Sequence, residues 1–179
     1  MGNEIPTSQF GLEDIEAFTN RLHEETQLLS QWFENNHFAF EQKMFGYELE
    51  AWLVDNNFQP APINEQFLRA LNDSLVVPEL ASFNIEINSL PQRLGGSVFS
   101  DMHQNLQQIY NRCRHQAQLT DSDLLFIGVL PTVKEADLSL EHMSNSPRYR
   151  ALNEQIFRLR HGRPLRIDIK GEEHLYTTH

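Results

Sequence analysis

The stretch MFGYELEAWLVD, residues 44 to 55, alternates apolar and other side chains with a period of two. This period is typical of a β-strand, in which successive side chains point to opposite faces of the sheet. The odd positions from 45 to 53 are all apolar, whereas Glu48 and Glu50 stand at even positions. The pattern therefore predicts a strand that points both carboxylates to one face, where they repel each other unless a cation lies between them.

A second run, FNIEINSL at residues 83 to 90, alternates in the same way and carries Glu86 on its polar side. If both runs share one sheet and one core, Glu86 joins Glu48 and Glu50 on the opposite face. Carboxylate oxygens beside amides suit Mg2+ or Mn2+. The alternative is a face open to water with solvated glutamates, as in many antiparallel sheets. The Glu-x-Glu pair with a third glutamate in a matching strand favours the metal site.

Glu79, in the segment VVPEL at residues 76 to 80, is a further candidate ligand because it lies shortly before the second run. It precedes Glu86 by seven positions, an odd separation. Strand parity would then place the two carboxylates on opposite faces. A bend in the chain is expected if Glu79 is to join the same site.

Composition limits the class of protein. A chain of 179 residues with 40% hydrophobic residues is long enough for one well-packed domain, and residues 1 to 179 are expected to form a single domain. The sequence has neither an apolar run of membrane-spanning length nor a secretory leader, which predicts a cytoplasmic protein without a membrane partner. The net charge of -11 argues against nucleic-acid binding. Cys113 is expected to be a small apolar residue on a helix.

Apolar residues at helical spacing predict helices from residue 12, from Asn64 as N-cap, from Ser97 as N-cap, and from Ser146-Pro147. The first and third are long and amphipathic and should cover the apolar face of the sheet. LLFIGVL, residues 124 to 130, and LRIDIKG, residues 165 to 171, read as further strands. The expected fold class is α+β, an antiparallel sheet with helices packed on one face.

Two cations, Arg148 and Arg150, fall in the first turn of the last predicted helix. Cations at this end oppose the helix dipole, and the placement makes sense if an anion such as phosphate is held there. The alternative is that both arginines pair with acidic residues of this acidic chain. The pattern by itself favours this pairing, and Arg148 and Arg150 are candidate substrate-binding and catalytic residues if an anion is held there.

GYELEAWLVD from residue 46 and VPELASFNIEINSLP from residue 77 resemble the start of the glutamate-cysteine ligase family, in particular its second bacterial type of carboxylate-amine ligases. SNSPRYRAL from residue 144 is a weaker match to the segment that carries substrate-facing basic residues in that family. The resemblance implies a glutamine-synthetase-like catalytic fold. It also implies that Glu48, Glu50, Glu79 and Glu86 hold Mg2+ or Mn2+, with ATP as co-substrate. Members of the family are longer, so the chain is expected to be the N-terminal portion of a ligase catalytic domain.

The activity implied is ATP-dependent amide formation from glutamate and cysteine, or another amine, as in glutathione biosynthesis. The glutamate side-chain carboxylate would take the terminal phosphate of ATP, and the amine would then displace phosphate from the acyl phosphate. These 179 residues alone are expected not to ligate efficiently and to self-associate through exposed apolar surface. Two other functions remain open: a guanidino-kinase-like phosphotransferase, and a non-catalytic metal- or nucleotide-binding domain.

Overall fold

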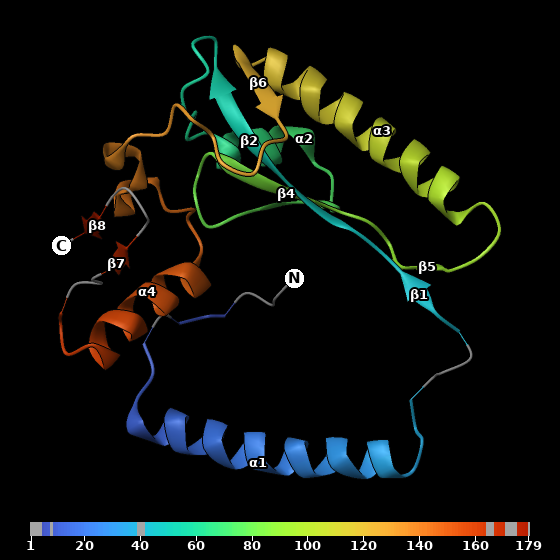
Figure 1. The fold of residues 1–179 in the computed structure, drawn as a ribbon, viewed down its shortest axis with the longest axis vertical. Helices are drawn as coiled ribbons and strands as arrows, with labels where there is room; N and C mark the ends of the chain where they lie inside the picture. Colours follow the sequence, from blue (N-terminus) through green and yellow to red (C-terminus); the bar gives the residue numbers. More distant parts are fainter. Residues whose placement is uncertain (1–4, 8, 39–41, 164–166, 171–174, 179) are drawn as a thin grey trace. The chain divides into compact units, whose positions relative to one another are not determined.

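The computed structural model of this chain describes all residues except 1–4, 8, 39–41, 164–166, 171–174 and 179 (Figure 1). The chain divides into two compact units. One consists of residues 1–23 together with 146–179, and the other of residues 24–145. The second unit carries the main sheet and all four predicted glutamate ligands.

The main sheet is antiparallel throughout and has the strand order β3-β4-β2-β6. Its strands are β2 (Glu48–Asp55), β3 (Val76–Pro78), β4 (Asn84–Asn88) and β6 (Ser122–Leu125). Proline in β3 is tolerated because β3 is an edge strand, where one row of backbone N–H groups needs no partner. The mixed α and β architecture with antiparallel sheets is thus confirmed, whereas the glutamine-synthetase-like fold stays a prediction.

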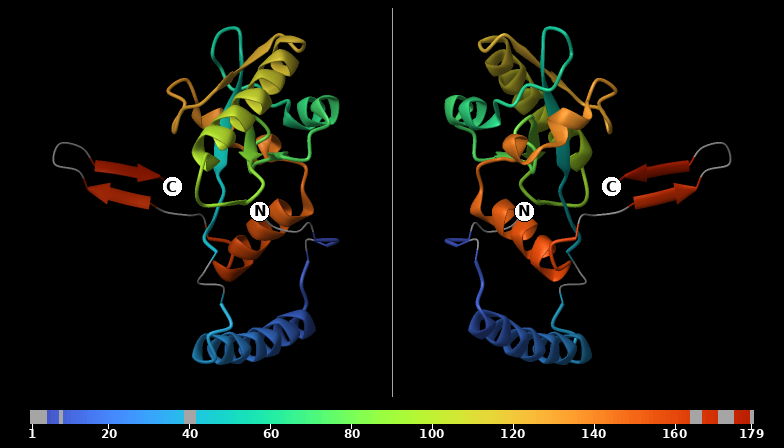
Figure 2. Two further views of the ribbon diagram at one scale, coloured as in Figure 1. Left: turned by 90° about the vertical axis from the view of Figure 1, so that its right-hand side faces the viewer. Right: turned by 90° about the vertical axis from the view of Figure 1, so that its left-hand side faces the viewer.

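The apolar face of this sheet packs on two helices, α2 (Asn64–Leu71) and α3 (Val98–Gln118). Both helices lie on the same side of β2 in the two views of Figure 2. Removing each large apolar side chain from water stabilises the fold by roughly 1.5–3 kcal/mol. The buried core consists of Ala51, Leu53, Ala61, Phe67, Val76, Ile85, Ile87, Ile109, Cys113, Ala117 and Leu124. Cys113 lies on the helix α3, as predicted; it is fully buried, and burial raises the pKa of its thiol to about 12.

The long N-terminal helix is present as α1 (Leu12–Glu34), but none of its residues is buried. Within the unit of residues 24–145, the short helix α2 joins α3 in covering the sheet and buries Phe67 completely. An amphipathic stripe shows that a helix needs an apolar partner, but it does not name the partner. The helix predicted from residue 12 is therefore confirmed, whereas its packing on the sheet stays a prediction.

The predicted strand of residues 44 to 55 is broken at Gly46. β1 (Met44–Phe45) pairs with β5 (Gln92–Arg93), and only the part from Glu48 joins the main sheet. At the break, the backbone N–H of Tyr47 donates to Ser89 Oγ at 2.7 Å. A Cβ on Gly46 would lie 3.2 Å from the same Oγ, so glycine gives this side chain room.

The strand predicted at residues 124 to 130 lies earlier in the chain, at Ser122–Leu125. Beyond it, Phe126, Ile127 and Val129 are exposed. The ladder with β2 ends at the pair Trp52 and Leu125, and the Trp52 indole N–H donates to the carbonyl of Ile127 at 2.9 Å. A continuous apolar run cannot reveal this limit, because the pairing partner decides where an edge strand ends.

The segment up to Asn145 holds two short 3-10 helices, η1 (Glu135–Leu138) and η2 (Leu140–His142). The predicted helix after Ser146 is present as α4 (Pro147–Leu159), with proline in its first turn. The strand predicted at residues 165 to 171 is present as β7 (Ile167–Lys170), while its outermost residues lie outside the described ones. It pairs with β8 (Leu175–Thr178), a strand that the sequence reasoning missed.

Candidate functional site

The polar face of the main sheet brings together the glutamates predicted from the alternation. In the register of β2 with β4, Glu50 stands directly opposite Glu86, and Glu48 stands opposite Asn88. Directly opposed residues of an antiparallel pair point to the same face, with Cβ atoms about 4.5–5.5 Å apart. Glu48, Glu50 and Glu86 therefore share one face, while their role as metal ligands stays a prediction.

Glu79 joins the same face without the bend that its odd separation from Glu86 suggested. β3 and β4 are antiparallel, and Val77 stands directly opposite Glu86. Opposed residues point to the same face, so the residue two positions after Val77 also shares the face of Glu86. The next position on that face is Glu79 beside Asn84, where the Glu79 N–H donates to the Asn84 carbonyl at 3.4 Å. Counting positions along the chain from Glu79 to Glu86 predicted the wrong face, because the alternation of side chains does not continue through the turn between two paired strands.

Glu86 is the buried member of the group, with only 5% of its surface exposed. Its Oε1 accepts a hydrogen bond of 2.7 Å from the side-chain amide of Asn88. By contrast, Glu48 and Glu50 are exposed. Burying a carboxylate costs free energy unless its charge is compensated. A bound cation would therefore stabilise the charge of Glu86 more than that of the exposed Glu48 and Glu50.

Glu79 shows the electrostatic consequence of this crowding. Burial raises the pKa of Glu79, and a hydrogen bond with the Glu86 carboxyl and the negative charges of Glu86 and Glu50 raise it further. The backbone N–H of Leu80, which donates to Glu79 Oε2 at 3.2 Å, opposes this rise. Two carboxyl groups can share a hydrogen bond only if one keeps a proton. The same neighbours therefore favour the protonated form of Glu79, and a cation bound here would compete with that proton.

A buried hydrogen-bond network, here called the Asn64 network, holds the turn between β3 and β4. The side-chain amide of Asn64 donates to Ser144 Oγ at 2.8 Å, to the Asn84 carbonyl at 3.1 Å and to the Ala81 carbonyl at 3.3 Å. Ser144 Oγ in turn donates to the Glu79 carbonyl. The network therefore sets the position of Glu79 relative to Asn84.

The sequence reasoning assigned Asn64 a different role, that of helix N-cap. In the structure Ile63 is the N-cap residue and Asn64 is the first residue of α2. The side-chain partners of Asn64 lie 17 to 80 positions away in the chain. No local pattern signals such a network, so this supporting residue could not be found from the sequence.

Aromatic side chains close one end of the carboxylate face. Trp52 lies two positions beyond Glu50 on the same face and stacks on Phe83, with ring centroids 5.4 Å apart and planes at 9°. Phe83 contacts the ring of His142 edge-on at 6.3 Å. The Nδ1 of His142 is hydrogen-bonded to the Asp137 carbonyl at 3.0 Å. This end of the face is therefore formed by rings in contact with one another, in contrast to the exposed end at Glu48.

The two predicted arginines lie in the first turn of α4, in the unit formed by residues 1–23 and 146–179. Arg148 is half-buried; its Nη2 donates to the Tyr149 hydroxyl at 2.8 Å, and its guanidinium lies 4.7 Å from the centre of the Tyr149 ring. Arg150 is exposed. Because the carboxylates belong to the other unit, a joint site of glutamates and arginines stays a prediction.

Within the described residues, no three side chains of His, Cys, Asp or Glu are grouped so that they could hold a metal ion as they stand. The donor set of the carboxylate face is nevertheless the hard oxygen type that Mg2+ and Mn2+ prefer. Glu48 and Glu50 are exposed and can change rotamer without displacing packed atoms. The residues thus fit a divalent cation by their chemistry and by their shared face.

Comparisons with family models, with curated proteins and with solved structures find no match to this chain. The resemblance to the glutamate-cysteine ligase family therefore stays a prediction that rests on the sequence motifs. In the described part of the chain, no helix is both long enough and apolar enough to cross a membrane.

Proposed function

We propose that this chain belongs to an ATP-dependent carboxylate-amine ligase of the glutamate-cysteine ligase type, acting in the cytoplasm. The observation that supports it is the convergence of Glu48, Glu50, Glu79 and Glu86 on one face of an antiparallel sheet. Those are the four positions at which the family motif carries its metal ligands. The fold proposed for the whole catalytic domain is glutamine-synthetase-like, and the proposed substrates are glutamate, ATP and cysteine or another amine.

In this proposal the four glutamates hold Mg2+ or Mn2+, which when bound neutralises charge on the phosphoryl oxygens of ATP. Glu86 is pre-oriented by the amide of Asn88 and needs no large rearrangement to bind a cation. Cation binding would compete with protonation of Glu79, whose pKa is raised by burial and by the neighbouring carboxylates. Arg148 and Arg150 would bind the phosphate groups at the N-terminal end of α4.

The test begins with a Mn2+ titration followed by electron paramagnetic resonance, because free and bound Mn2+ differ in signal. Glu86→Gln keeps the size of the side chain and removes its charge, so it should weaken Mn2+ binding at least tenfold. The matched control is Glu65→Gln, an exposed position of α2 that pairs with Arg69 at 2.8 Å. Equal affinity in Glu86→Gln and wild type would remove Glu86 from the site.

The reaction itself is tested by phosphate release from ATP in the presence of glutamate and cysteine. The assay is run on this chain and on any longer form of the protein, and the amide product is identified by mass spectrometry. Phosphate transfer to a guanidino nitrogen, without free phosphate, would indicate the phosphotransferase instead. Binding of Mn2+ and ATP with no turnover in any form would indicate a non-catalytic binding domain.

A further inference from the structure

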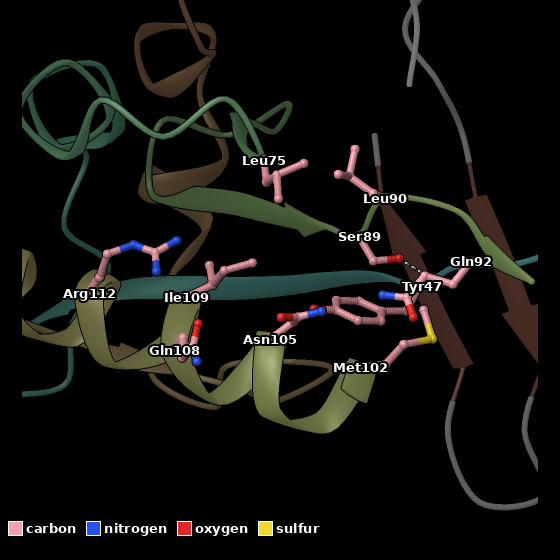
Figure 3. A pocket seen from close by; sticks show the side chains of 10 residues that line it. All are labelled: Tyr47, Leu75, Ser89, Leu90, Gln92, Met102, Asn105, Gln108, Ile109 and Arg112. Carbon is pink, nitrogen blue, oxygen red and sulfur yellow. Dashed lines mark hydrogen bonds between the residues drawn. The ribbon is translucent and has the colours of Figure 1, made fainter. Parts of the chain in front are cut away.

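A pocket lies on the apolar side of the main sheet, between α3 and the point where the chain enters β2 (Figure 3). Its volume is about 200 Å3. A water molecule occupies about 30 Å3 of the liquid, so the pocket has room for a molecule much larger than one water. Leu75, Met102 and Ile109 provide its apolar wall, and the side chains of Tyr47, Asn105 and Arg112 are among its polar ones.

Tyr47 supplies the observation that points to a ligand. Its ring extends from the start of β2 along α3 in Figure 3, and its hydroxyl oxygen is buried. Among the described residues this hydroxyl has no hydrogen-bond partner. Burial also raises its pKa, so it stays protonated and can donate. Buried polar atoms in native proteins are nearly always hydrogen-bonded, and an acceptor from a bound molecule would satisfy this one.

The charge of the pocket is balanced before any ligand enters. Arg112 Nη2 donates to the Asp73 carboxylate. Burial alone would raise the pKa of Asp73, but the hydrogen bonds from Arg112 and from the Leu75 N–H outweigh it and lower the pKa. Asp73 is therefore ionised at neutral pH and offsets the charge of Arg112. An anionic ligand would have to compete with this carboxylate.

We propose that this pocket binds a small uncharged molecule that has an apolar ring or chain and one carbonyl or hydroxyl oxygen, which accepts the Tyr47 hydroxyl. An apolar cavity of about 150 Å3 is known to take benzene, so a ring with one polar substituent matches the available space. Tyr47 stands at an odd position, so the pocket faces away from Glu48 and Glu50. The proposal is therefore independent of the ligase assignment.

Benzamide is a suitable probe, because it combines an aromatic ring with one strong carbonyl acceptor and carries no charge. Titration into the 15N-labelled protein should give saturable shifts of the backbone amides of Ser89, Asn105 and Ile109. Tyr47→Phe removes only the hydroxyl and should weaken binding about threefold to tenfold, as expected for one hydrogen bond. Tyr110→Phe is the matched control, since Tyr110 lies on α3 but lines a neighbouring pocket, and it should leave the affinity unchanged.

A second variant makes the test independent of Tyr47. Asn105 is exposed on α3, and Asn105→Tyr should fill the pocket and abolish the shifts without disturbing the core. Three results would overturn the proposal: no saturable shift in the wild type, equal affinity in Tyr47→Phe, or unchanged binding in Asn105→Tyr. Tighter binding of benzoate than of benzamide would also overturn it, because the site would then select an anion.

Discussion

The two faces of the main sheet are built from the same strands, yet they differ in almost every physical respect. On one face, Ala51 and Ile85 oppose each other and are fully buried beneath the helices. On the other face, the next pair along the ladder, Glu50 and Glu86, brings two carboxylates together. The first arrangement stabilises the fold by removing apolar area from water. The second costs free energy, because two like charges stand opposite each other and one of them, Glu86, is buried.

The strongest test of this contrast is Ile85→Ala on the buried face. Ile85 is 0% exposed, so the change removes packed methyl groups and leaves a cavity. The free energy of unfolding should fall by about 2–5 kcal/mol. Urea denaturation followed by tryptophan fluorescence measures it, with Ile127→Ala, at an exposed position, as the control. A loss no greater than that of Ile127→Ala would show that this face is not a packed core.

A smaller effect is expected for Asn64→Ala, which removes the Asn64 network behind the carboxylate face. The half-buried Ala81 and Asn84 carbonyls and the buried Ser144 Oγ lose a donor, and such a loss typically costs about 1–3 kcal/mol in total stability. Hydrogen exchange at the Ser144 amide, which donates to the Leu80 carbonyl at 2.8 Å, should accelerate more than exchange in α3. Gln104→Ala, which removes an amide side chain from an exposed position of α3, is the control. Uniform acceleration would mean that the network has no local role.

Glu79→Gln tests the electrostatic cost of the carboxylate face through pH. The folded-state pKa of Glu79 lies above its usual value of 4.5, so the native state keeps a proton that the unfolded state has lost. The free energy of unfolding should therefore fall as pH rises from about 4.5 through the folded pKa. Glu79→Gln should flatten this fall, whereas Glu65→Gln should not. A wild-type stability that rises over this range would contradict the assigned cause.

The smallest change in stability is expected for Glu50→Gln. Glu50 is exposed, so the free energy of unfolding should change by no more than about 0.5 kcal/mol. The free energy of unfolding should increase slightly at neutral pH, because one of the repelling charges is removed. Mn2+ affinity, measured on the same samples, should fall. A loss of stability comparable to that of Ile85→Ala would abolish the distinction between the two faces.

Much of the contrast between the faces could be predicted from local sequence. Side-chain direction in a strand is a property of the backbone alone, so alternation placed Glu48 and Glu50 on one face and the apolar residues on the other. Local signals also explain why the helix starting at Pro147 and the strand β4 lie where the pattern predicted them. Errors arose at boundaries such as Gly46 and Leu125, where a pairing partner ends the strand.

What the sequence by itself determined is therefore the chemistry of each face: period-two alternation assigns every residue of a strand to one side. Only the tertiary structure decided which residues meet across strands. The register placed Glu50 opposite Glu86, the turn after β3 brought Glu79 to their side, and Asn64 found partners far away in the chain. The physical reason is the distance along the chain over which each property is decided. Side-chain direction follows from the dihedral angles of neighbouring residues, whereas register and burial follow from the packing of segments that are remote in sequence.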